Sequence, residues 1–218
     1  MKYLIKELME EGILKTPSII DAFEKVDRKD FVPEELKDRA YLNTPLPIGY
    51  GQTISQPLTV AFMLELLQPE KGNKILEVGS GSGWQTALLA HIVSVGGKII
   101  AVELIPELMA FGRKNAAKYG FIKNKTVEFH SFNATKGMQE EAPFDRIISA
   151  ASGHDLPIAW KEQLKVGGRI VAPVKDAINL LVKKGPPVGE AGEMEFEESI
   201  YPGFAFVPLI SLNENIQL

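Results

Sequence analysis

The residues best suited to chemistry lie between Glu77 and Gly83, where an acidic residue is followed by alternating glycines in E-V-G-S-G-S-G. An apolar strand that runs into such glycines and then into a helix builds a nucleotide-sized crevice at the carboxyl end of the strand. The glycines permit tight turns and let a ligand approach main-chain N–H groups at the helix N-terminus. A dinucleotide fingerprint would need a further glycine where Trp84 stands, so the spacing disfavours a dinucleotide cofactor.

The pattern acidic-x-G-x-G-x-G resembles the first motif of the Rossmann-like S-adenosylmethionine-dependent methyltransferases. Glu103 ends the next expected strand, at an offset where a carboxylate can accept both ribose hydroxyls of a nucleoside. Asn133 stands where this class commonly carries an aspartate, and its amide carbonyl can accept from an adenine amino group without charge assistance. Two roles remain open for Glu77, which either braces the loop through backbone amides or lies near the amino-acid end of the cofactor.

Composition argues against several other functions. The chain has no cysteine, and its three histidines are scattered, so no disulfide and no metal site are expected. A formal charge of -4 argues against a nucleic-acid partner. No apolar run reaches the length of a membrane span and the N-terminus lacks a signal-peptide core, so we expect a cytoplasmic protein without a membrane partner.

The elements that position these residues alternate between strands and helices, which predicts an α/β fold with a doubly wound, mostly parallel sheet. An N-terminal helical segment precedes the sheet and a C-terminal β-hairpin follows it. The expected helices cover residues 2–11, 18–26, 58–67, 85–95, 107–119 and 157–164. The expected strands cover residues 74–78, 98–103, 126–130, 145–150, 169–174 and 178–183. The C-terminal part is expected to have a Pro/Gly turn at 185–192, a weakly alternating stretch at 193–200 and a β-rich strand at 204–210.

One domain is expected over residues 1–218. It comprises a helical segment at 1–70, a cofactor-binding core at 71–174 and C-terminal strands at 175–218. The charged cluster at 27–30 is interpreted as solvated and without function. Residues 31–57 are rich in proline and glycine, and an irregular stretch of that length is often a lid or binding loop. The active-site loop is placed at 45–57.

Within that loop the chain resembles the protein-L-isoaspartate O-methyltransferase family, whose members methylate isoaspartyl carboxylates in damaged proteins. The matching stretches are P-L-P-I at 45–48, G-Q-T-I-S-x-P at 51–57, L-E-V-G-x-G-S-G-W at 76–84, A-P-F-D at 142–145, Q-L-K-x-G-G at 163–168 and F-V-P-L at 206–209. The stretch at 51–57 is the most specific of these, because many methyltransferases share the glycine loop.

The resemblance implies a catalytic Ser55 whose hydroxyl touches the substrate carboxylate. It implies S-adenosylmethionine as the cofactor and isoaspartyl-containing polypeptides as the substrate. The implied cofactor-binding residues are Ile54, Glu77, Val78, Gly79, Ser80, Gly81, Gly83, Glu103, Leu104, Asn133 and Ala134. The implied substrate-binding residues are Thr53, Val207, Pro208 and Leu209.

Two departures from the family pattern bear on cofactor affinity. Asn133, between Phe132 and Ala134, replaces the usual Gly-Asp-Gly, and S-A-A-S at 149–152 only approximates Thr-Ala-Ala. Weaker adenine recognition is therefore expected.

The expected chemistry needs few catalytic groups. A carboxylate is already a nucleophile at neutral pH, so no general base is required and catalysis can rest on alignment of the reacting atoms. We expect a monomeric isoaspartyl methyltransferase. The alternatives are a methyltransferase for another carboxylate, on a small molecule or a modified peptide, and a non-catalytic module that binds S-adenosylmethionine.

Overall fold

A seven-stranded sheet forms the centre of the computed structural model, which describes residues 1–185 and 195–209. Its strand order is β10-β9-β8-β6-β3-β4-β5. The strands are β3 (Lys74–Val78), β4 (Lys98–Glu103), β5 (Val127–Ser131), β6 (Phe144–Ser149), β8 (Leu164–Val174), β9 (Ala177–Lys183) and β10 (Phe196–Pro202). Strands β3, β4, β5, β6 and β8 are parallel, whereas β9 and β10 run antiparallel to their neighbours. The connections diverge from β3, with β4 on one side and β6 on the other, and such a switch point places a crevice at the strand's carboxyl end.

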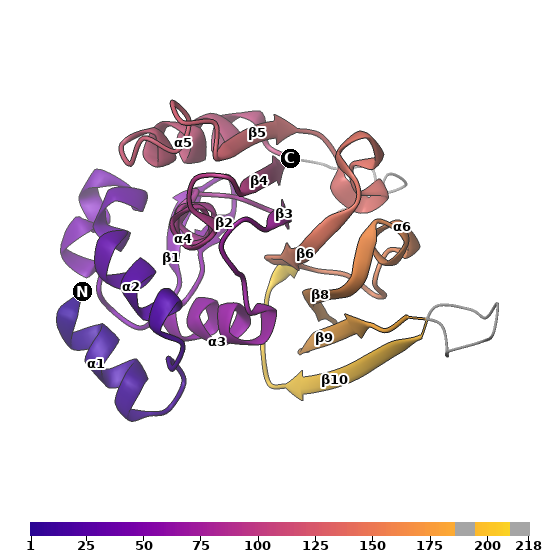
Figure 1. Ribbon diagram of the computed structural model, residues 1–218. Helices are drawn as coiled ribbons and strands as arrows, with labels where there is room; N and C mark the ends of the chain where they lie inside the picture. Colours follow the sequence, from indigo (N-terminus) through magenta and orange to yellow (C-terminus); the bar gives the residue numbers. More distant parts are fainter. Residues whose placement is uncertain (186–194, 210–218) are drawn as a thin grey trace.

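Helices cover both faces of this sheet, as the doubly wound prediction requires. Alternate strand residues enter two separate apolar cores, with Ile75 in one and Leu76 in the other. Five helices belong to the first core, namely α1 (Lys2–Glu10), α2 (Pro17–Lys25), α3 (Pro57–Leu67), α4 (Trp84–Val93) and α5 (Pro106–Ala117). The second core lies under α6 (Ile158–Glu162) and the short 3-10 helix η3 (Ala134–Lys136). Figure 1 shows α1 and α2 on the far side of α3 and α4 from the antiparallel strands.

The expected strands 74–78 and 98–103 match β3 and β4 residue for residue, whereas β8 begins five residues earlier than expected. The Gly167-Gly168 pair, which precedes the expected strand at 169–174, lies within β8. An added Cβ at Gly168 would lie 2.9 Å from the Asp145 carbonyl oxygen, so the glycine permits β8 to pass close to β6 at an irregular point in their pairing.

The segment between α2 and α3 has more order than the sequence predicts. It contains the 3-10 helices η1 (Arg28–Phe31) and η2 (Glu34–Arg39), followed by an antiparallel hairpin of β1 (Leu46–Gly49) and β2 (Gln52–Ile54). The prolines keep each element short, as expected. The interpretation of 27–30 as a solvated cluster was wrong for Arg28, because this side chain is fully buried and its guanidinium donates to backbone carbonyl oxygens, whereas Lys29 is exposed.

The C-terminal strands separate into two pairings. Strands β9 and β10 form a hairpin, with Lys183 opposite Phe196, but both belong to the central sheet, whereas the sequence predicted a hairpin that follows the sheet. The predicted turn at 185–192 falls largely outside the described residues. Strand β11 (Val207–Pro208) then pairs in parallel with β7 (Ala151–Ser152), which directly follows β6. The chain thereby returns to the carboxyl edge of the sheet. Of the expected strand 204–210, residue 210 is not described.

Candidate active site

A cavity of about 760 Å³ opens at the carboxyl ends of β3 and β4. This volume lies in the range of pockets that enclose small-molecule ligands. Segments that are far apart in the sequence share its wall. They are the β1–β2 hairpin and the residues after it, the glycine loop, the turn after β4, residues 132–134 and residues 202–209.

The glycine loop folds tightly because its backbone is held by β4. Gly79 has a φ of 80°, a left-handed conformation that favours glycine, and its N–H donates to the Val102 carbonyl at 2.8 Å. Ser80 donates to the same carbonyl at 3.1 Å. Val78, Gly79, Ser80 and Gly81, all predicted cofactor residues, line the cavity.

Glu103 braces this loop in addition to lining the cavity. One carboxylate oxygen accepts from the Gly81 N–H at 2.8 Å, and the other accepts from the Ile105 N–H at 3.1 Å. A carboxylate has about four lone-pair positions, so these bonds leave capacity for the predicted ribose hydroxyls. Leu104, the other residue predicted at this turn, is half-buried and also lines the cavity.

Glu77 lies behind the loop and is not among the residues that line the cavity. Burial raises the pKa of Glu77 to about 8, opposed by hydrogen bonding to Thr86 and Gln85 and reinforced by the Glu103 charge. Its Oε1 accepts from Gln85 Nε2 at 3.1 Å, and Gln85 does line the cavity. Glu77 therefore supports a cavity residue through a side chain, rather than through backbone amides, which was one of the two roles predicted for it. Gln85 was missed, because nothing in its helical surroundings distinguishes it from other buried positions.

Gly83 is also set back from the cavity. Its backbone has a φ of 82°, and an added Cβ would lie 2.6 Å from the Gly112 carbonyl oxygen of α5. Close packing of α4 on α5 thus accounts for this glycine. The cavity wall gives no support to the predicted direct contact of Gly83 with the cofactor.

The predicted adenine end is built from η3. Asn133 is half-buried at the cavity, and its Oδ1 accepts from the Thr135 N–H at 3.0 Å, which caps η3. The Trp160 indole N–H fixes the adjacent Ala134 by donating to its carbonyl at 2.8 Å.

The predicted substrate-facing residues meet across the same cavity. Thr53, Ile54 and Ser55 line it from the hairpin side, with Thr53 exposed and Ile54 buried. Val207, Pro208 and Leu209 line it from β11 and the residue that follows. The hairpin also abuts the glycine loop, since an added Cβ at Gly81 would lie 3.4 Å from Ile48 Cδ1.

The described residues 1–185 and 195–209 contain no group of three or more His, Cys, Asp or Glu side chains that could bind a metal ion. In the same ranges no helix combines the length and the apolar character needed to cross a bilayer.

Comparisons with known proteins agree with this geometry. The family model for protein-L-isoaspartate(D-aspartate) O-methyltransferase matches residues 1–214. The protein-L-isoaspartate O-methyltransferase of Methanopyrus kandleri is 44% identical over 207 residues, which cover 95% of this chain and 89% of that protein. The enzyme of the same name from Staphylothermus marinus is 42% identical over 212 residues, covering 95% and 92%.

A solved structure shows the same fold. The Plasmodium falciparum chain assigned to this type of enzyme, in complex with S-adenosyl-L-homocysteine, superposes with a TM-score of 0.84 at 24% identity, covering 96% of this chain and 97% of that one. The match to the family model, supported by relatives above 40% identity along nearly the whole length, identifies the family. The chain belongs to the protein-L-isoaspartate(D-aspartate) O-methyltransferase family.

Proposed function

We propose that this protein transfers a methyl group from S-adenosylmethionine to the carboxylate of L-isoaspartyl residues in damaged proteins. One observation carries the proposal: Ser55, the glycine loop and Val207–Pro208 of β11 line a single cavity. Ser55 and Val207–Pro208 belong to the sequence stretches that distinguish the family. The glycine loop forms a crevice of the type that binds nucleosides. Family membership and the names of the relatives support the same reaction.

The residues around the cavity fit the cofactor in size and chemistry. The loop 79–81 presents backbone at the carboxyl end of β3, and the Glu103 carboxylate suits the two ribose hydroxyls. Leu104 and Ala134 supply apolar wall, and Asn133 supplies an amide. When bound there, S-adenosylmethionine supplies a methyl group already activated by its sulfonium.

The protein's own residues then have three tasks. Ser55 donates a hydrogen bond to the isoaspartyl carboxylate and orients it. Thr53 and the 207–209 segment hold the surrounding substrate backbone. The hairpin excludes water, which leaves the carboxylate a stronger nucleophile. No proton has to be removed, because the carboxyl group is ionised at neutral pH. Correct placement is therefore the main contribution of the protein, and placement alone supplies on the order of 7–11 kcal/mol in favourable cases.

The three predicted segments each contribute described residues to the cavity. The N-terminal segment 1–70 provides the hairpin, the core 71–174 provides the cofactor loop, and the C-terminal strands provide the 207–209 wall. We therefore treat them as one catalytic unit.

Methyl transfer to a matched pair of peptides tests the proposal. The peptides have the same sequence, with isoaspartate in one and aspartate in the other, and labelled S-adenosylmethionine is the donor. We expect labelling of the isoaspartyl peptide only. Equal labelling of both peptides, or labelling of small carboxylic acids instead, contradicts the isoaspartyl assignment. Calorimetric binding of the cofactor without transfer to any carboxylate supports a non-catalytic binding module.

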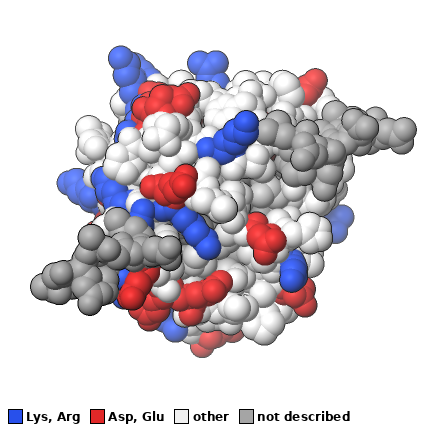
Figure 2. Space-filling model, turned by 90° about the vertical axis from the view of Figure 1, so that its right-hand side faces the viewer, with Lys and Arg blue, Asp and Glu red and all other residues white. Residues whose placement is uncertain are grey.

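We further propose that the protein acts as a cytoplasmic monomer and does not bind nucleic acid. The net charge of -4 supports the last point, and Figure 2 shows acidic and basic side chains interspersed on the face in view. The absence of cysteine is compatible with a reducing compartment. Light scattering coupled to gel filtration tests the monomeric state.

A further inference from the structure

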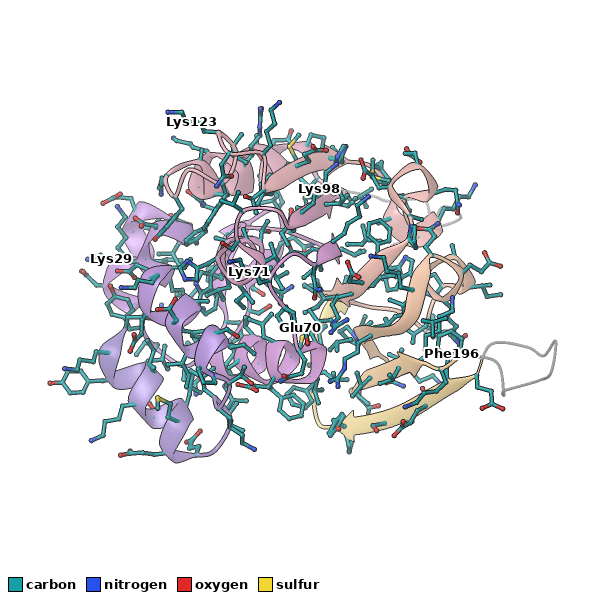
Figure 3. All side chains as sticks on the ribbon, viewed as in Figure 1. Lys29, Glu70, Lys71, Lys98, Lys123 and Phe196 are labelled. Carbon is teal, nitrogen blue, oxygen red and sulfur yellow. The ribbon has the colours of Figure 1, made fainter. Side chains whose placement is uncertain are left out.

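Arg28 is a buried cation outside the residues that line the cavity. Its side chain is 0% exposed, whereas the adjacent Lys29 lies at the outer surface of the N-terminal segment (Figure 3). Burial lowers the pKa of the Arg28 guanidinium to about 10, so the group remains charged at neutral pH. A buried charge is unfavourable unless hydrogen bonds compensate for it. The partners of Arg28 therefore indicate what this side chain holds in place.

Those partners lie at both ends of the β1–β2 hairpin. Nη1 donates to the carbonyl oxygens of Ala40 at 2.7 Å and Leu42 at 3.2 Å. Nη2 donates to the carbonyl oxygens of Thr44 and Ser55, both at 3.0 Å. The first three acceptors precede β1, and the fourth follows β2 directly. The guanidinium thus ties the segment that leads into the hairpin to the residue that follows it.

The same guanidinium also contacts the cofactor side of the site. Its central carbon lies 5.3 Å from the centroid of the Trp84 ring, a cation–π distance. Trp84 is the first residue of α4 and follows the glycine loop immediately. The Trp84 ring is held in turn by Phe23, with the centroids 5.5 Å apart in an edge-on arrangement. Arg28 therefore connects the base of the hairpin to the end of the glycine loop.

We propose that Arg28 is a positioning residue that sets where Ser55 lies relative to the glycine loop, and so aligns the substrate carboxylate with the methyl donor. This inference rests on the proposed function. One of the four carbonyl groups that accept from Arg28 belongs to Ser55 itself. A shift of that carbonyl therefore displaces the hydroxyl on the same residue. A lysine at this position has the charge but lacks the planar fork that binds several carbonyls at once.

The variants Arg28→Met and Arg28→Lys test this role, with Arg146→Met as a matched control. Arg146 also donates to backbone carbonyls, those of Leu67 and Gln68 at the end of α3, but is not among the cavity-lining residues. Each variant is assayed at a temperature where circular dichroism shows it folded.

For Arg28→Met we expect kcat/KM for an isoaspartyl peptide to fall about a hundredfold, the scale of a small misplacement of reacting groups, and Arg28→Lys to fall less. The affinity for S-adenosylhomocysteine should change by no more than about threefold. Arg146→Met should lower the melting temperature and leave kcat/KM unchanged. The proposal is overturned if Arg28→Met retains the kcat/KM of Arg146→Met, or if cofactor affinity falls in parallel with turnover.

Hydrogen exchange gives a second readout that does not depend on activity. Arg28→Lys should speed amide exchange in residues 45–56 while protection of α4 stays at the wild-type level. Exchange that rises uniformly over the protein contradicts the proposal. Should Arg28→Met fail to fold, this measurement and the kinetics of Arg28→Lys decide the question. A wild-type protein that does not methylate the isoaspartyl peptide refutes the proposed function, while the exchange result still decides whether Arg28 holds the hairpin.

Discussion

Replacing Gly83 by alanine tests whether this glycine is required for close packing of α4 on α5 or for contact with the cofactor. The left-handed backbone, with φ at 82°, costs an L-residue roughly 1–2 kcal/mol. The new Cβ would also lie 2.6 Å from a backbone oxygen of Gly112, which cannot rotate away as a side chain could. Overpacking of this kind costs about 1–3 kcal/mol. We therefore expect Gly83→Ala to lower the free energy of unfolding by about 2–5 kcal/mol, which corresponds to roughly 4–20 °C in melting temperature for a chain of this length.

Gly120→Ala is the matched control for this substitution. Gly120 has a φ of 78°, and an added Cβ there meets nothing within 4 Å, so only the backbone cost applies. Thermal unfolding by circular dichroism should show a loss of roughly 2–8 °C for Gly120→Ala and a clearly larger loss for Gly83→Ala. Equal melting temperatures for the two variants refute the packing argument. If Gly83→Ala is stable but no longer binds S-adenosylhomocysteine, that result supports the direct cofactor contact predicted from the sequence.

Three further substitutions probe the site. Ser55→Ala should lower kcat/KM for an isoaspartyl peptide roughly thirtyfold, the loss of about 2 kcal/mol for a hydrogen bond to a charged group, with unchanged S-adenosylhomocysteine affinity by calorimetry; unchanged kinetics remove Ser55 from the catalytic role. Glu103→Gln should weaken S-adenosylhomocysteine binding about tenfold to a hundredfold in the same titration, because the bonds to Gly81 and to ribose lose their charge assistance, and an unaltered affinity excludes the ribose contact. Burial raises the pKa of Glu77 in the folded protein to about 8, above its pKa in the unfolded chain. Between these two pKa values the folded state binds more protons than the unfolded state. The free energy of unfolding therefore falls as the pH rises from the lower pKa to the higher one. Glu77→Gln should flatten this fall in melting temperature between about pH 5 and pH 8, and a slope equal to that of the wild type contradicts the raised pKa.

The parts of the fold that follow from local patterns were predictable. Strands β3 and β4 are short apolar runs bounded by turn residues, and such runs identify buried parallel strands. Helix α3 matched its prediction to within one residue, because Pro57 marks its start and a predominantly apolar run follows. The confirmed order of alternating elements also led directly to the parallel sheet.

The contacts that local patterns cannot encode were missed. Arg28 resembles its charged neighbours in sequence, and only its acceptors at positions 40–55 reveal that it is buried. Gly83 belongs to a motif predicted to bind the cofactor, yet the atom that requires a glycine there is on Gly112, in another helix. The pairing of β11 with β7 joins residues more than fifty positions apart. The predicted roles of the individual cavity residues still await the measurements above.

The pairing of β11 with β7 also has a consequence for the order in which the protein acquires its parts during synthesis. Ribosomes release a chain from its N-terminus, and domains form as their residues emerge. The hairpin, the glycine loop and the parallel strands can assemble early, because all of them precede residue 175. The wall formed by residues 207–209 can join them only after that sheet exists to receive it. A nascent chain would therefore form the crevice at the glycine loop before the wall that we propose to hold the substrate.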